Sequence, residues 1–84
     1  MTAQEAVSRI QVLESALSEI DVKLHRMREL AVHAAGSAST VAGRAYLDVE
    51  FQKLKKEIDE ISRHAESITE AMSDDNNITV RGML

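Results

Sequence analysis

The feature that most constrains this chain is an apolar pattern that repeats every three and four residues. In the first half of the sequence the pattern comprises Ile10, Leu13, Leu17, Ile20, Leu24, Met27, Ala31 and Ala34. This spacing places apolar side chains along one side of an α-helix and is typical of the seam of a coiled coil. The sequence contains no Pro and only three Gly, so little interrupts such a helix. The pattern therefore predicts a long helix that packs against another helix.

Signals at both ends of this stretch set its expected limits. Thr2 and Glu5 have the spacing of a capping box, in which both side chains bond to free backbone N–H groups of the first helical turn. Gly36 supplies a residue that tolerates the left-handed conformation common after a helix. The first helix is expected to span residues 3–35.

A second apolar pattern with the same spacing follows in the other half of the chain. It comprises Leu47, Phe51, Leu54, Ile58, Ile61, Ala65, Ile68 and Met72. Small and polar residues fill positions 36–43 between the two patterns, as in a loop, and Ser39 or Thr40 can cap the next helix. The sequence thus predicts a loop at 36–43 and a second helix at 44–73.

Folding back at this loop would bring the two seams together in antiparallel register. Ala34 then meets Leu47, the small Ala31 leaves room for Phe51, and the later layers follow in order. The expected packing seam comprises Leu17, Ile20, Leu24, Met27, Phe51, Leu54, Ile58 and Ile61. The same register places Lys23 near Glu57. The predicted fold is all-α, an antiparallel two-helix coiled-coil hairpin. Because two helices bury only one seam, the hairpin is expected to complete a helical bundle by self-association as a homodimer.

The last part of the sequence differs in character. After Met72, residues 73–77 (SDDNN) are weak helix formers, and Ile78–Val80 is a short β-prone run. The expected organisation is a hairpin at 1–73 and a tail at 74–84. The tail either stays separate or lends a strand to a neighbouring molecule, and the first alternative is favoured.

Composition and spacing offer little support for chemistry. Aromatic residues make up 2% of the chain and Cys is absent, which leaves neither an aromatic-lined pocket nor a thiolate metal site. His25, His33 and His64 lack the close spacing of a helical zinc motif. A net charge of −4 without a basic run argues against nucleic-acid binding, and no apolar run is long enough to cross a membrane. No enzyme, cofactor or metal is expected.

Two blocks of sequence resemble the amino-terminal coiled-coil region of bacterial flagellin. The first is LHRMRELAV at residues 24–32, which is preceded by scattered matches from Ala3 to Ile20, and the second is EFQKLKKEIDEIS at residues 50–62. In flagellin this region forms the inner rod of the subunit, and subunits pack through it into the filament. The resemblance implies a structural protein with flagellin-type partners. It also implies secretion to the bacterial flagellum through an export apparatus that needs no cleavable signal peptide.

The departures from the family pattern keep other possibilities open. Flagellins usually continue the second block with a Phe-Asn-Gly turn, whereas residues 63–68 (RHAESI) continue the helical pattern here. The terminal helices that carry polymerisation in flagellins have no counterpart in this sequence, so the chain alone is not expected to build a filament. Alternatives are a free-standing coiled-coil adaptor, or a flagellin-like protein with a non-filament role. Without export signals such a protein would stay cytoplasmic.

The resemblance also implies a set of partner-binding residues: Arg26, Arg28, Leu30 and Glu50. In flagellins the equivalents of Arg26, Leu30 and Glu50 lie on the exposed side of the rod. There they serve filament packing and are read by the Toll-like innate receptor for flagellin. Arg is suited to such a role, because its planar guanidinium forms bidentate bonds with carboxylates while its stem covers apolar area.

Overall fold

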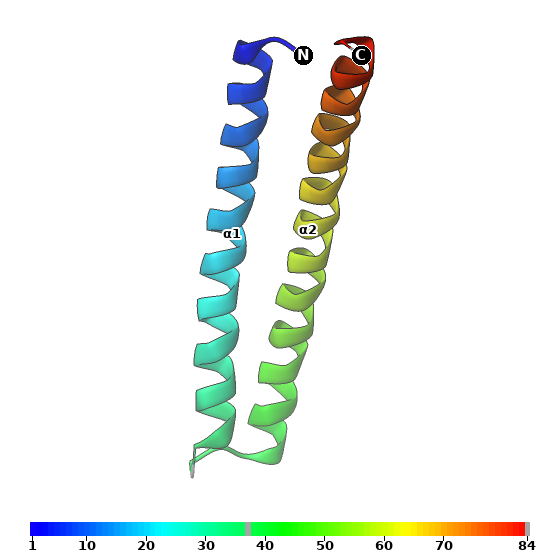
Figure 1. Cartoon of the computed structure of the whole chain (residues 1–84). Coiled ribbons are helices and arrows are strands. Elements are labelled where there is room, and N and C mark those ends of the chain that lie inside the picture. Colours follow the sequence, from blue (N-terminus) through cyan, green and yellow to red (C-terminus); the bar gives the residue numbers. More distant parts are fainter. Residues whose placement is uncertain (37, 84) are drawn as a thin grey trace.

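Two long helices lie side by side in a hairpin. The computed structural model describes the backbone of residues 1–36 and 38–83 and the side chains up to residue 74, apart from residue 37. Helix α1 (Ala3–Ala35) and helix α2 (Val41–Met83) run antiparallel, so that both termini lie at the end opposite the connecting loop (Figure 1). The molecule is a rod with extents of 65 × 17 × 14 Å. The prediction of an all-α helical hairpin is confirmed.

Helix α1 has the expected bounds but a different C-terminal cap. The Thr2 hydroxyl accepts a hydrogen bond from the Glu5 N–H at 3.1 Å, as the capping signal predicts. Gly36 is not left-handed, because its φ of −68° and ψ of 150° are extended. The left-handed cap is unnecessary, since the Ser39 hydroxyl donates to the Ala34 carbonyl oxygen at 3.0 Å and satisfies the last turn from the loop.

Helix α2 begins three residues earlier than expected. The Thr40 hydroxyl accepts a hydrogen bond from the Gly43 N–H at 3.0 Å, which makes Thr40 the N-cap. The Arg44 guanidinium donates to the Ser39 hydroxyl at 3.0 Å and so holds the loop against the first turn. Gly43, which the sequence places in the loop, therefore lies within the helix.

Replacing Thr40 with Ala is expected to destabilise the hairpin by about 1 kcal/mol, because one N–H of the first turn loses its acceptor. Thr69→Ala is the matched control. The Thr69 hydroxyl donates to the Ala65 carbonyl oxygen within α2, where Ala is the better helix former, so no loss is expected. Urea unfolding followed by circular dichroism measures both changes. Equal losses for the two variants would contradict the role of Thr40.

The C-terminal residues form part of α2, which overturns the expected tail with a strand-prone run at 78–80. The helix continues to Met83. The Asp and Asn residues at 74–77 are weak helix formers, but each costs only about 0.7 kcal/mol relative to Ala. Continuing an existing helix adds one hydrogen bond per residue without a new nucleation step. Side chains at 75–84 lie outside the described residues.

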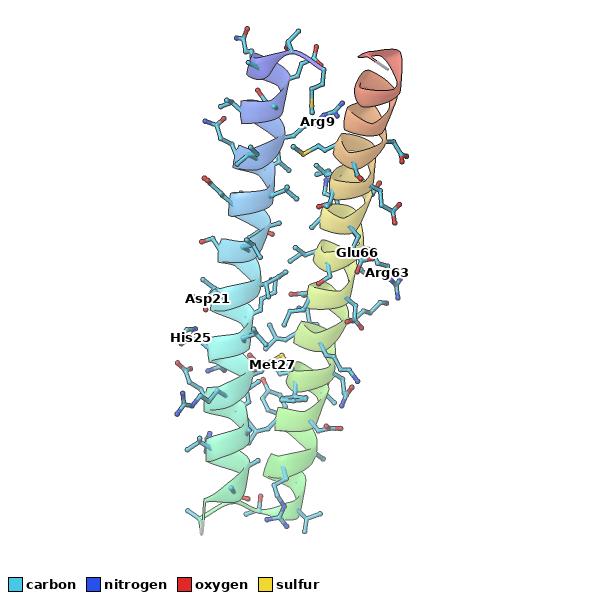
Figure 2. The ribbon with its side chains drawn as sticks, in the orientation of Figure 1. Arg9, Asp21, His25, Met27, Arg63 and Glu66 are labelled. Carbon is cyan, nitrogen blue, oxygen red and sulfur yellow. The ribbon has the colours of Figure 1, made fainter. Side chains whose placement is uncertain are left out.

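The packing seam of α2 agrees with the prediction. All eight apolar residues expected to face α1, from Leu47 to Met72, are partly buried in the hairpin. On α1 the partly buried or buried residues instead comprise Ala6, Arg9, Leu13, Ala16, Ile20, Lys23, Met27, Leu30 and Ala34. Figure 2 shows Met27 pointing toward α2, whereas Asp21 and His25 lie on the outer side of α1. We call the residues on this inner side of each helix the packing seam.

Half of the predicted seam on α1 is therefore wrong. Leu17 and Leu24, expected in the seam, are 65% and 51% exposed, and Ile10 and Ala31 are exposed as well. Among the described side chains only Leu30 and Ala16 are buried, at 2% and 8% exposure. The observed seam differs from the predicted one by a rotation of about 50° about the helix axis, half of the 100° that separates successive residues.

Ion pairs between the helices accompany this rotation. The observed orientation brings Lys23 and Arg26 of α1 to carboxylates of α2, and the small Ala16 permits close approach of the two backbones. Long basic side chains can also cover apolar surface with their stems while the charge stays in water. The predicted orientation would also keep Lys23 beside the seam near Glu57, whereas it would turn Arg26 further from α2. Ile10, Leu17, Leu24 and Ala31 form a line on α1 beside the packing seam, and we call this line the apolar stripe.

Candidate interaction surface

Arg26 links the two helices at the surface of the rod. Its Nε donates to Glu50 Oε1 at 3.0 Å and its Nη2 donates to Glu50 Oε2 at 3.3 Å, which is a bidentate pair. Its Nη1 also donates to Glu29 Oε2 at 3.2 Å. These bonds, that to Glu50 first, raise the pKa of Arg26 above its ordinary value. The guanidinium is thus held in one orientation by both helices.

The structure separates the other two residues implied by the flagellin resemblance. Leu30, expected on the exposed side of the rod, is buried against α2, so that expectation is wrong. Its place in the packing seam follows from the rotation of α1. Arg28 is exposed and lines a shallow hollow with His25 and Val32 on α1, on a different face from Arg26. Only Arg26 and Glu50 come together at one surface.

A hollow beside this pair includes Tyr46, which was not predicted to belong to a binding surface. It has a volume of about 460 Å³ and is lined by Arg26, Glu50, His33, Ala38, Ser39, Thr40, Gly43, Tyr46 and Leu47. Tyr46 is 74% exposed and lies one helical turn before Glu50. That four-residue spacing was the available signal, since it places an aromatic ring next to the charged pair. The surface can offer a partner hydrogen bonds, charge and aromatic area.

A second ion pair fixes the register of the helices near their middle. Lys23 Nζ lies 2.9 Å from Glu57 Oε2, so the predicted proximity of these residues is confirmed. Both side chains are only partly exposed, at 26% and 34%. The hydrogen bond from Lys23 lowers the pKa of Glu57 below its usual value of 4.5, although partial burial opposes this effect.

The lowered pKa of Glu57 predicts how stability depends on pH. Because the folded chain binds this proton less readily than the unfolded chain, the stabilisation is present above pH 4.5 and is lost as the pH falls through the lowered pKa. Melting temperatures of the parent and Glu57→Gln should therefore differ at pH 7 and converge toward pH 2.5. Lys23→Met should give the same flattened profile. Parallel pH profiles for parent and variants would contradict the assignment.

Among the described residues, no three His, Cys, Asp or Glu side chains are grouped so that they could hold a metal ion. Within the same part of the chain, no helix is both long enough and apolar enough to span a membrane.

The extended pair of amphipathic helices, tied by surface ion pairs, defines a coiled-coil rod. The sequence matches the family described as the bacterial flagellin N-terminal helical region over residues 1–77. The chain belongs to the bacterial flagellin family. No solved structure matches the sequence.

Individual flagellins show how much of the family this chain represents. It is 38% identical over 79 residues to a flagellin of Halalkalibacterium halodurans, a match that covers 94% of this chain and 29% of the relative. It is 42% identical over 64 residues to the flagellar filament 33 kDa core protein of Treponema phagedenis, covering 76% and 22%. A flagellin of Salmonella typhimurium is 31% identical over 80 residues. The chain spans less than a third of the length of these relatives.

Proposed function

We propose that this chain is a rod segment through which flagellin-type subunits pack in the bacterial flagellar filament outside the cell. The flagellin family is structural, and its amino-terminal helical region matches residues 1–77. The observation that carries the proposal is the apolar surface that the hairpin leaves exposed on α1, in a region that matches the flagellin rod. Leu17 and Leu24 are each more than half exposed. Burying such side chains against another helix is favourable, by about 25 cal/mol per Å² of apolar area.

Arg26 and Glu50 are the proposed contact residues at one face of this rod. They are oriented by both helices, so little side-chain entropy remains to be lost when a partner binds. Arg28 would contribute to a separate contact on the outer face of α1. Leu30 would act only indirectly, by holding α1 against α2. Self-association as a homodimer is part of the same proposal, since each copy carries an identical rod.

Binding to flagellin tests this proposal. Purified monomeric flagellin of Halalkalibacterium halodurans would be titrated into the fluorescently labelled chain. Saturable binding is expected, and Arg26→Ala should weaken it at least tenfold if the guanidinium anchors the contact. Lys56→Ala, an exposed cation on α2 away from this pair, is the control and should bind like the parent. No binding at about 100 μM flagellin would contradict the proposal.

A second candidate is recognition by the Toll-like innate receptor for flagellin. The observation that favours it is the exposed Arg26, held by Glu50 and placed beside Tyr46, since Arg and Tyr are enriched at binding hot spots. Surface plasmon resonance with the receptor ectodomain, comparing the parent with Arg26→Ala, tests it. Equal binding of the parent and Arg26→Ala to the receptor would show that Arg26 does not contribute to recognition.

A further inference from the structure

We propose that the apolar stripe of α1 pairs antiparallel with the apolar stripe of a second copy of this chain. This inference rests on the proposed function, because it treats α1 as a packing helix, and it names the surface, the partner and the orientation. Ile10, Leu17 and Leu24 are 45%, 65% and 51% exposed and recur every seven residues, so they form one continuous line. The seam residues Leu13, Ile20 and Met27 border this line and are only partly buried by α2.

Side-chain sizes along α1 fit an antiparallel partner. The apolar residues that repeat every three and four positions from Ile10 to Ala34 have bulky side chains in the first half of the series and small side chains at its end. In antiparallel pairing Ile10 meets Ala34 of the second copy, Leu13 meets its Ala31, and Leu17 meets its Met27. Each layer then joins two apolar residues, and in the two outer layers the bulky Ile10 and Leu13 face the small Ala34 and Ala31. A parallel pair would instead put Ala31 and Ala34 against themselves and leave a gap.

A hollow in the hairpin lies where the bulky end of the second copy would arrive. It has a volume of about 320 Å³ and is lined by Leu30, Ala31, Ala34, Leu47 and Phe51 with two charged residues at its edge, Arg44 and Asp48. The antiparallel register places Ile10 and Leu13 of the second copy over Ala34 and Ala31. These two side chains would fill the hollow. A knob of one helix entering a hole of another is the packing mode of coiled coils.

Charges beside the apolar stripe favour the same orientation. Glu14, Asp21 and Arg28 follow one another at seven-residue spacing along its outer edge. Antiparallel pairing places Arg28 of one copy beside Glu14 of the other, twice in each dimer. The two Asp21 side chains meet at the symmetry axis, each with His25 of its own chain at 3.5 Å. A parallel pair would oppose every charge with its like.

Sedimentation equilibrium at tens of micromolar tests the pairing with two matched variants. Leu17 and Val22 are 65% and 66% exposed in the hairpin, but only Leu17 lies in the apolar stripe. The parent and Val22→Asn should sediment as dimers of twice 9.3 kDa. Leu17→Asn should weaken dimerisation at least about 100-fold, because two leucines leave the interface of each dimer. A monomeric parent, or a dimer that Leu17→Asn leaves unchanged, would overturn the proposal.

Cross-linking through introduced cysteines tests the orientation of the two copies. Because the chain has no Cys of its own, each introduced Cys is its single thiol. Chains with Glu14→Cys and chains with Arg28→Cys are mixed and treated with a short bismaleimide. The antiparallel dimer predicts that mixed 14–28 products exceed the 14–14 and 28–28 products at least fivefold, and Lys56→Cys should give none. A majority of 14–14 products would overturn the orientation. Flagellin binding by a chain that fails both tests would leave the proposed packing with flagellin-type subunits standing, so the two failures are distinguishable.

Discussion

Leu30→Ala is expected to destabilise the hairpin by about 2–5 kcal/mol, the usual cost of removing a buried leucine. Leu30 is 2% exposed and lies against α2, so truncation leaves a cavity in the packing seam. Leu24→Ala is the matched control, because Leu24 is on the same helix but 51% exposed, and its loss should stay below about 1 kcal/mol. Urea unfolding at a concentration that keeps the chain monomeric measures both. A larger loss of stability for Leu24→Ala than for Leu30→Ala would show that Leu24 faces α2, as the seam predicted from sequence requires.

Phe51→Ala should have the second largest effect. Its ring is partly buried and lines the hollow at the loop end of the rod together with Leu30 and Leu47. Full burial of such a ring would make truncation cost about 3–5 kcal/mol, so partial burial lowers the expected loss to about 2–3 kcal/mol. Tyr46→Ala removes an aromatic ring that is 74% exposed on the same helix, and it should change stability by less than about 0.5 kcal/mol. Similar losses for Phe51 and Tyr46 would show that α2 is oriented differently.

The sequence could predict the hairpin and the seam of α2, because on α2 only one line of apolar residues exists. Leu54 and Ile58 have charged neighbours on both sides, which leaves one way to bury them. On α1 the pattern is ambiguous. Leu13, Ile20, Met27 and Ala34 can alternate with the apolar stripe or with Ala16, Lys23 and Leu30. Hydrophobicity favours the first choice, whereas the ion pairs of Lys23 and Arg26 with α2 accompany the second.

The candidate interaction surface could likewise be predicted only in part from the sequence. The sequence names Arg26 and Glu50 through the flagellin resemblance, but only the antiparallel register with its rotated α1 brings them within hydrogen-bond distance. The same rotation buries Leu30, which a pattern on one helix cannot reveal. The C-terminal end of α2 differs for another reason. Weak helix formers at 73–77 do not stop a helix that is already formed.

The wide apolar surface of α1 connects the fold to the proposed function. A helix that buries only one seam needs a narrow apolar line, yet α1 carries the packing seam and the apolar stripe side by side. The packing seam contacts α2 within the hairpin, and the apolar stripe remains exposed for contact with a further helix. This arrangement accounts for both the thin rod and the proposal that the chain acts by packing with other subunits.

The most direct test of the central claim is filament assembly by a chimeric flagellin. This chain would replace the matching 79-residue region of the Halalkalibacterium halodurans flagellin, with which it shares 38% identity. Electron microscopy of purified chimera under conditions that polymerise the parent flagellin provides the measurement. Filaments from the chimera, and their loss on Leu30→Ala, are the predicted result. A folded chimera that stays monomeric while the parent flagellin polymerises would contradict the role of this chain as a flagellin rod segment.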